Sequence, residues 1–177
     1  MMALVLGVSA IANDCCDIKN NAKCDCTTEK KSENCHYDKE KKVIGLAHSG
    51  WRGTSKKMAA IMLEEMSKNF GTDSKDVIAC IGPGICQDCY QVSGDVYEEF
   101  LKSFSKEDVE TFFREDGKEH FRLSLWKANE KVLEDAGVLK ENIFTSNICT
   151  ACNPNLLYSH RIMGEIRGNL AAFLALK

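Results

Sequence analysis

Residues 41–53 read KKVIGLAHSGWRG, and this stretch decides how the rest of the chain is interpreted. The apolar run at residues 43–47 predicts a short buried strand. Glycines follow the run, so His48, Trp51 and Arg52 fall on a turn between a strand and a helix. Such turns often present functional side chains on a rigid scaffold. The alternative is purely structural: a core histidine, with the tryptophan anchoring a packed turn.

The overall composition is that of an ordinary globular protein. The chain has 177 residues, which suffices for one domain with a substantial core. Hydrophobic residues make up 44% and charged residues 28%, and the net charge is −3. Acidic and basic residues are interspersed, so the sequence lacks the electrostatic footprint of a nucleic-acid-binding protein. A phosphate-sized substrate is still compatible with it, because a few arginines in one pocket are enough to bind one.

The first twelve residues, MMALVLGVSAIA, are apolar. No basic residue precedes this run, as a secretory signal would require, and the run is too short to span a bilayer. We therefore expect a buried strand here and no association with a membrane.

The chain contains ten cysteines. Because the apolar segments supply a normal core, disulfides are not needed for stability, and we expect a reducing, cytoplasmic environment. Residues 16–36 are polar and poor in aliphatic side chains, which predicts an inserted loop. Cys24, Cys26 and Cys35 with His36 could bind zinc or copper there. The C-x-C spacing differs from that of structural zinc sites, so we favour a disordered loop with incidental thiols.

The rest of the chain alternates between helical and extended patterns. We expect Thr54 to begin a helix, with Met58, Ile61, Met62, Met66 and Phe70 on its apolar face and Gly71 at its end. A later helix is expected after Ser124, a candidate cap, and it should end at Gly137. The other expected elements are a strand at 77–81, a helix at about 94–105 and a strand at 142–149.

Two C-x-x-C pairs occur, Cys86 with Cys89 and Cys149 with Cys152. Each could be a redox pair or a metal-binding pair. Together they supply enough thiolates for a four-cysteine zinc site. Both pairs also lie within motifs typical of one protein family, and we favour that explanation of their presence.

The motifs HSGWRG, IGPGICQDCYQV, NICT and YSHR with RGN occur in this order over about residues 43–177. Together they resemble the laccase-domain family, whose members were first called multicopper polyphenol oxidoreductases and are now regarded as zinc-dependent purine nucleoside phosphorylases. The resemblance implies an α+β fold, a layered α/β/β/α-type domain with mixed sheets and outer helices. It also implies a single laccase-type domain over residues 1–177 that carries the Cys-rich loop at 16–36.

The family binds its metal through the cysteine of an A-D-C motif, the histidine of an H-A-G-W-R-G motif and a further, more N-terminal histidine. By this resemblance the metal ligands here are Cys15, in Asn13-Asp14-Cys15, and His48. Cys35 is a nearer alternative for the thiol. The chain begins almost at the A-D-C strand, so we expect the segment with the further histidine to be missing. His36, His160 or a water could then supply the third ligand.

The residue types suit the implied chemistry. Thiolate and imidazole bind zinc or copper, and zinc activates a bound water. Arg52 and Arg161 could clamp phosphate, because guanidinium groups match its oxygens. The resemblance adds Thr150 to the substrate-binding residues, whereas Ile162 stands where many relatives carry a second arginine.

The expected function is phosphorolysis of a purine nucleoside (adenosine, inosine or methylthioadenosine), with adenosine deamination as a related activity. Cys15, His48 and Arg52 are the expected catalytic residues and zinc is the expected cofactor. The partners are then a small nucleoside and phosphate. Three alternatives remain: a copper-dependent polyphenol oxidoreductase, a cysteine hydrolase that uses Cys15 and His48, and an inactive metal-binding relative.

Overall fold

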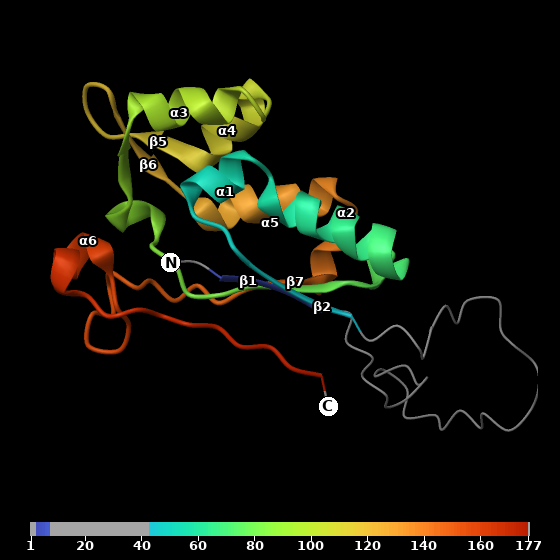
Figure 1. Cartoon of the computed structure of the whole chain (residues 1–177). Helices are drawn as coiled ribbons and strands as arrows, with labels where there is room; N and C mark the ends of the chain where they lie inside the picture. The colour runs from blue at the N-terminus through green and yellow to red at the C-terminus, as the bar shows by residue number, and fades with distance from the viewer. Residues whose placement is uncertain (1–2, 8–42, 177) are drawn as a thin grey trace, which may run out of the picture.

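The computed structural model describes residues 3–7 and 43–176 of the chain. Strands and helices are mixed, and parallel and antiparallel pairing both occur (Figure 1). The expected α+β class is therefore confirmed. The Cys-rich loop expected at residues 16–36, together with Cys15, Cys35 and His36, lies outside the described residues.

The strands form two sheets, one with four strands in the order β2-β1-β3-β7 and one with three in the order β4-β6-β5. The strands are β1 (Ala3–Gly7), β2 (Ile44–His48), β3 (Ile78–Ile81), β4 (Gln91–Ser93), β5 (Phe113–Glu115), β6 (His120–Leu123) and β7 (Ile143–Thr145). The helices are α1 (Trp51–Ser55), α2 (Met58–Phe70), α3 (Gly94–Leu101), α4 (Lys106–Phe112), α5 (Leu125–Asp135) and α6 (His160–Met163).

Strand direction places three chain segments at the same edge of the larger sheet. Strands β2 and β3 both run antiparallel to β1, so they run in the same direction, and β7 is parallel to β3. The residues that follow β2, β3 and β7 therefore leave the sheet at one edge. Loops at the carboxyl ends of such strands are a common position for ligand sites.

The faces of the larger sheet differ because side chains alternate along a strand. Ala79 and Ile81 of β3 are fully buried, and α5 contacts both β3 and β7. Cys80 is exposed and lies opposite Phe144, which is also exposed. The helices α1, α2 and α5 thus cover the face with the alanine and isoleucine (Figure 1).

Helix α2 confirms most of its expected pattern. Met66 and Leu63 are buried, and Gly71 ends the helix with φ 66°, a left-handed conformation that suits glycine. Strand β2, on which α2 packs, needs its small residue at position 45, since a Cβ at Gly45 would lie 3.0 Å from the sulfur atoms of Met62 and Met66. The predicted apolar face is wrong in part, because Ile61 and Phe70 point outward and are exposed.

An aromatic cluster attaches α3 and α4 to the smaller sheet. Phe100 is fully buried, with its ring centroid 5.2 Å from that of Phe113 and 5.5 Å from that of Phe104. Tyr97 stacks on Phe121 of β6 at 4.5 Å. Such offset and edge-to-face pairs add to the stabilisation from burial. These contacts fix α3 and α4 against the smaller sheet, which contains β4.

No helix in the parts of the chain that the structure describes is long and apolar enough to cross a membrane.

Candidate functional site

The strand-to-helix turn expected at residues 48–53 is present. Strand β2 ends at His48, Gly50 is the N-cap in an extended conformation, and α1 begins at Trp51. The side chain of His48 is exposed, and a Cβ at Gly50 would lie 3.1 Å from its Nε2 atom. The glycine therefore leaves room for the imidazole ring beside the turn.

A buried polar network holds this turn in place. Ser49 Oγ donates a hydrogen bond of 2.8 Å to Asn129 Oδ1, and Asn129 Nδ2 donates to Thr54 Oγ1 at 2.9 Å and to the Leu125 carbonyl at 2.8 Å. Ser49, Thr54 and Asn129 are all fully buried. Because buried polar groups are costly unless paired, this network fixes the turn against α5.

The network corrects one expectation from the sequence. Thr54 does not begin a long helix. It lies within the short helix α1, and α2 starts only after Lys57, which has φ 56°. Ser49 and Asn129 were missed, because nothing in the local sequence marks a serine and an asparagine so far apart in the chain as partners.

Arg52 is exposed at the start of α1, with its guanidinium 4.3 Å from the centroid of the Trp51 ring. This is a cation–π contact, which restrains the arginine over a half-buried anchor. Arg161, on α6, has its guanidinium 5.5 Å from the centroid of the Tyr90 ring, and its Nη2 donates to the carbonyl of Gln91 at 2.9 Å. Each arginine is thus oriented by a contact of its own.

Both arginines influence the pKa of one residue, the half-buried Tyr90. Burial raises the pKa of the Tyr90 hydroxyl, and the positive charges of Arg161 and Arg52 partly offset that rise. Arg52 also helps to lower the pKa of Asp95, although a hydrogen bond from Ser93 is the larger cause. The charges of Arg52 and Arg161, which come from motifs far apart in the sequence, therefore both act on one tyrosine.

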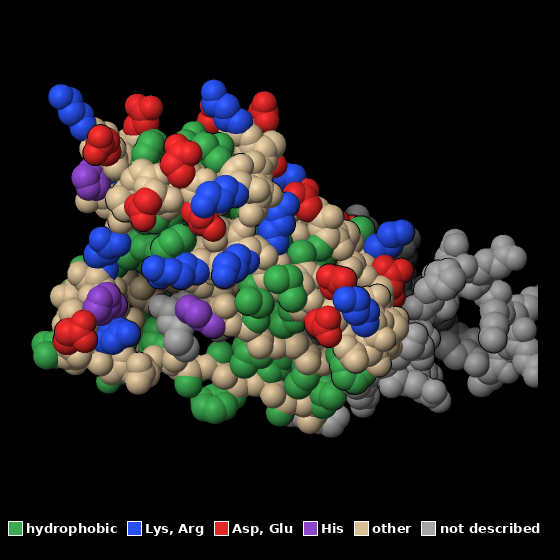
Figure 2. Space-filling view, turned by 45° about the horizontal axis from the view of Figure 1, so that its top comes forward, with side chains coloured by type: hydrophobic (Ala, Val, Ile, Leu, Met, Phe, Trp, Pro, Cys, Tyr) green, Lys and Arg blue, Asp and Glu red, His purple; other side chains and the backbone are tan. Residues whose placement is uncertain are grey.

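The surface around them is basic in part. On the face drawn in Figure 2, Lys and Arg side chains form a row beside a histidine, while many acidic side chains gather toward the top of the view. A hollow of about 570 Å³ at the start of α3 is lined by three carboxylates, those of Asp95, Glu98 and Glu119. That hollow is poorly suited to an anion, and the positively charged arginines suit one better.

Thr150 and His160 are placed differently from the arginines. Thr150 is buried, and its backbone N–H donates to the carbonyl of Gly84 at 2.9 Å. His160 is exposed, with Nδ1 3.2 Å from the carbonyl oxygen of Gly164 in its own loop. Neither contact tests the ligand or substrate role expected for these residues. The pairing of Cys15 with His48 involves a residue outside the described ranges.

The four cysteines of the two C-x-x-C pairs come together. The Sγ atoms of Cys86, Cys89, Cys149 and Cys152 all lie within 4.8 Å of one another. Among the described residues this is the one group of three or more His, Cys, Asp or Glu side chains positioned to hold a metal ion, and His48 is not part of it. The sequence showed that four thiols were available, but not that they meet.

The cysteines of the cluster differ in pKa, in part because of their hydrogen bonds. The backbone N–H groups of Cys86 and Cys152 donate to Cys149 Sγ at 3.3 and 3.4 Å. Burial alone would raise the pKa of Cys149, but these N–H groups and the neighbouring thiols outweigh it and lower the pKa to about 7. The pKa of Cys89 is raised, chiefly by burial, and that of Cys152 is raised, chiefly by its contact with Cys149. Cys149 thus ionises more readily than Cys89 or Cys152.

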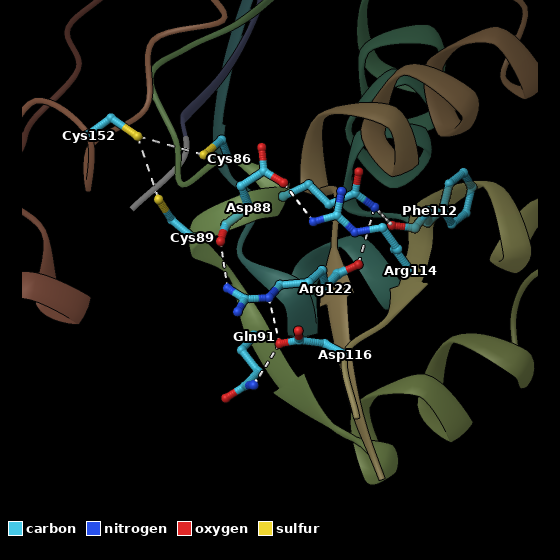
Figure 3. A network of polar contacts seen from close by, with 10 residues as sticks. Cys86, Asp88, Cys89, Gln91, Phe112, Arg114, Asp116, Arg122 and Cys152 are labelled. Atoms are coloured by element: carbon cyan, nitrogen blue, oxygen red, sulfur yellow. Dashed lines mark hydrogen bonds and ion pairs between the residues drawn. The ribbon is translucent and has the colours of Figure 1, made fainter. Parts of the chain in front are cut away.

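The turn between Cys86 and Cys89 is anchored to the smaller sheet (Figure 3). Arg122 Nη1 donates to the Asp88 carbonyl at 2.5 Å, and Arg114 pairs with the Asp88 carboxylate at 2.7 Å. Gln87 Nε2 donates to the carbonyls of Phe112 and Arg122 at 3.1 and 3.2 Å. These bonds hold the first C-x-x-C pair in a fixed shape.

The fold and these side chains define an α+β protein in which a histidine at the end of β2, arginines on α1 and α6, and a cysteine cluster follow the strands of one sheet. A family model described as multi-copper polyphenol oxidoreductase laccase matches residues 35–177. The chain belongs to this laccase-domain family.

Its relatives include proteins named purine nucleoside phosphorylase and adenosine deaminase. The chain is 32% identical over 141 residues to purine nucleoside phosphorylase YlmD of Bacillus subtilis, covering 80% of this chain and 50% of the relative. It is 36% identical over 128 residues to adenosine deaminase RL5 from an unknown prokaryotic organism, covering 72% and 48%. The chain thus spans about half the length of the curated relatives it matches.

The fold is likewise similar to that of a solved relative. The crystal structure of YlmD from Geobacillus stearothermophilus matches with a TM-score of 0.64 and 34% identity, over 67% of this chain and 44% of that one. The family resemblance expected from the motifs and the fold it implies are therefore confirmed.

Proposed function

We propose that this chain binds a purine nucleoside and phosphate and catalyses phosphorolysis of the glycosidic bond. The names of its relatives, purine nucleoside phosphorylase and adenosine deaminase, support a purine nucleoside as the substrate. They do not decide between the two reactions. Residues of this chain favour phosphorolysis.

The observation that carries the proposal is that the Arg161 guanidinium lies 5.5 Å from the centroid of the Tyr90 ring and that the charge of Arg52 acts on the same tyrosine. Two guanidinium groups acting on one spot can hold a phosphate through several charge-assisted hydrogen bonds. Deamination by water needs no anion site, whereas phosphorolysis does. Arg52 lies on α1, directly after the turn that follows His48. Phosphate bound to Arg52 would therefore lie beside the loops at the carboxyl edge of the larger sheet.

The reaction needs few groups besides these. A phosphate oxygen forms a bond to the anomeric carbon of the ribose, the bond from that carbon to the purine nitrogen breaks, and the base leaves with the bonding electrons and takes up a proton. The arginines would position the phosphate and neutralise its charge. A tyrosine hydroxyl, with an ordinary pKa of about 10, keeps its proton at neutral pH, and burial raises the pKa of Tyr90 further, so this hydroxyl can donate a hydrogen bond to phosphate or substrate.

We propose His48 and Cys15 as ligands of a zinc ion at this site, as the family resemblance implies. The exposed imidazole of His48 at the end of β2 is a suitable donor. When bound, zinc would supply a Lewis acid and an activated water. The residues of the chain described here would bind phosphate, orient it and hold the turn rigid.

Incubation with adenosine or inosine, with and without phosphate, tests the proposal. Phosphorolysis predicts free base and ribose 1-phosphate only when phosphate is present, whereas deamination predicts inosine and ammonia from adenosine without it. Arg52→Ala and Arg161→Ala should each weaken the dependence on phosphate. Lys68→Ala is the control, because that lysine is an exposed cation on α2 that pairs with Glu64 and Glu65 of its own helix.

Other products would support the alternatives. Oxidation of phenols by copper-loaded protein would favour the oxidoreductase, and a substrate adduct on the thiol of Cys15 would favour the cysteine hydrolase. Zinc-loaded protein that converts no nucleoside at any phosphate concentration would contradict the proposal and favour an inactive metal-binding relative.

A further inference from the structure

The cysteine cluster has a geometry that the proposed reaction does not use. Around a tetrahedral zinc ion with Zn–S bonds of about 2.3 Å, neighbouring sulfur atoms lie about 3.8 Å apart. Here Cys152 Sγ lies 3.9 Å from Cys86 Sγ and 3.5 Å from Cys89 Sγ, and all four sulfurs are within 4.8 Å of one another. Figure 3 shows the sulfurs of Cys86, Cys89 and Cys152 pointing toward one another.

We propose that Cys86, Cys89, Cys149 and Cys152 bind one zinc ion as a closed structural site, separate from the catalytic site proposed above. Both pairs have the C-x-x-C spacing of structural zinc sites. Four thiolates complete a tetrahedral shell and leave no position for water or substrate, so the site is structural rather than catalytic. Binding releases the thiol protons to solvent as the sulfurs become thiolates.

The protein around the cluster is already arranged for an ion. Two backbone N–H groups point at Cys149 Sγ, which is the kind of second contact that orients metal-bound thiolates. Arg122 fixes the Asp88 carbonyl between the two cysteines of the first pair. A disulfide would need two sulfurs about 2.05 Å apart, which would pull two members out of this arrangement.

The site joins two segments that the pairing of β3 with β7 brings side by side. The first pair follows β3 and the second follows β7, with a parallel bridge between Gly84 and Cys149. Beyond Cys152 the described chain has little regular structure, and its large apolar side chains are exposed, among them Leu156 at 82% and Ile166 at 92%. Small, core-poor segments are commonly held by a metal instead of by burial. The zinc would hold this segment, and Arg161 with it, against β4.

Metal analysis tests the site without any assay of activity. The full chain, purified with a reducing agent and no chelator, should retain about one zinc ion per chain in the His48→Ala, Cys15→Ser background, which removes the proposed catalytic ligands. Adding Cys152→Ser should remove that zinc. Cys152 is exposed, so this change creates no core cavity. Cys80→Ser is the matched control, because Cys80 is an exposed cysteine outside the cluster, and it should keep the zinc.

Two further measurements keep the test decisive if a variant folds poorly. Cobalt substituted into the unmodified cluster should give the visible spectrum of a tetrahedral tetrathiolate. Trypsin should cleave after Arg161 and Arg167 several-fold faster once zinc is removed, because the segment is released. Bound iron, a disulfide within the cluster, or zinc content unchanged by Cys152→Ser would overturn the proposal. None of these results depends on whether the chain phosphorolyses nucleosides.

Discussion

The two arginines proposed to bind phosphate are held in very different ways. Arg52 follows a turn that is held by a buried hydrogen-bond network of Ser49, Thr54 and Asn129. Arg161 sits on a four-residue helix in a segment with exposed apolar side chains, close in the chain to the cysteine cluster. The position of Arg52 is thus supported by the core, whereas that of Arg161 depends on local contacts. Arg161 should therefore be displaced more easily than Arg52.

The largest expected effect is on the rigid side. Asn129→Ala should lower the free energy of unfolding by about 3 kcal/mol, because the Ser49 hydroxyl and the Leu125 carbonyl lose their buried partner. The melting temperature should fall by roughly 6–12 °C. Urea unfolding of the zinc-loaded protein measures the change.

Asn69→Ala is the control for this prediction. Asn69 is exposed on α2 and bonds only to Glu65 within its own helix, so its loss should cost about 0.5 kcal/mol or less. Equal losses from the two substitutions would mean that the network does not stabilise the turn.

The second prediction compares the arginines directly. Arg52→Ala and Arg161→Ala should each raise the KM for phosphate by roughly 10- to 100-fold, the equivalent of a charged hydrogen bond of about 1.5–3 kcal/mol. In a Cys152→Ser background, Arg161→Ala should have little further effect, because the arginine is already released. Arg52→Ala should keep its full effect there.

The measurement is a pair of double-mutant cycles on the KM for phosphate. Full additivity of Arg161→Ala with Cys152→Ser would show that the cysteine cluster does not position Arg161. This test depends on both proposals above, whereas zinc content tests the cluster alone.

A smaller effect is expected at Gly50. In Gly50→Ala the new Cβ would lie 3.1 Å from His48 Nε2, so the exposed ring must shift by a few tenths of an ångström. Stability should change by less than about 1 kcal/mol, since no core contact is lost. Zinc should bind more weakly at the proposed His48 site while zinc in the cysteine cluster is retained, as counted by metal analysis. Gly94→Ala, whose Cβ would meet only Glu119 at 3.8 Å, should lose neither ion.

The smallest effect concerns Asp116, next to β4. A hydrogen bond from Gln91, and then the nearby Arg122, lower the pKa of its carboxyl. A lowered pKa contributes stability that is present above the ordinary pKa of about 3.9 and is lost as the pH falls through the lower folded value. Gln91→Ala should move the pKa of Asp116 up toward the ordinary value, as followed by NMR titration. An unchanged pKa would mean that Arg122 alone sets it.

Features fixed by neighbouring residues were predictable from the sequence. The strand before His48, the helix ending at Gly71 and the Ser124 cap of α5 all follow from local patterns, and the structure confirms them. The short elements β4, α4 and β5 were not predicted, because each is too brief to show a clear period. Their aromatic side chains become informative only once they meet in the cluster around Phe100.

The candidate site was predictable by residue type but not by arrangement. Motifs pointed to His48, Arg52 and Arg161, yet Tyr90, whose ring faces the Arg161 guanidinium, carries no signal of its own in the sequence. Asn129 contacts a serine 80 positions away, and Cys86 contacts a cysteine 63 positions away. Such pairs depend on how strands are ordered in a sheet, which local patterns do not specify.

The parallel pairing of β3 with β7 also bears on the order of events in folding. The chain between these strands contains the whole smaller sheet and helices α3 to α5, so it must fold back on itself before Cys80 meets Phe144. Contacts between such distant residues form late, because closing a long loop has an entropic cost that is recovered only afterwards. Contact between the two cysteine pairs closes a loop of similar length, since Cys86 and Cys149 are 63 positions apart. We therefore expect the four thiols to meet late in folding as well, and protection of those thiols from alkylation would report that event.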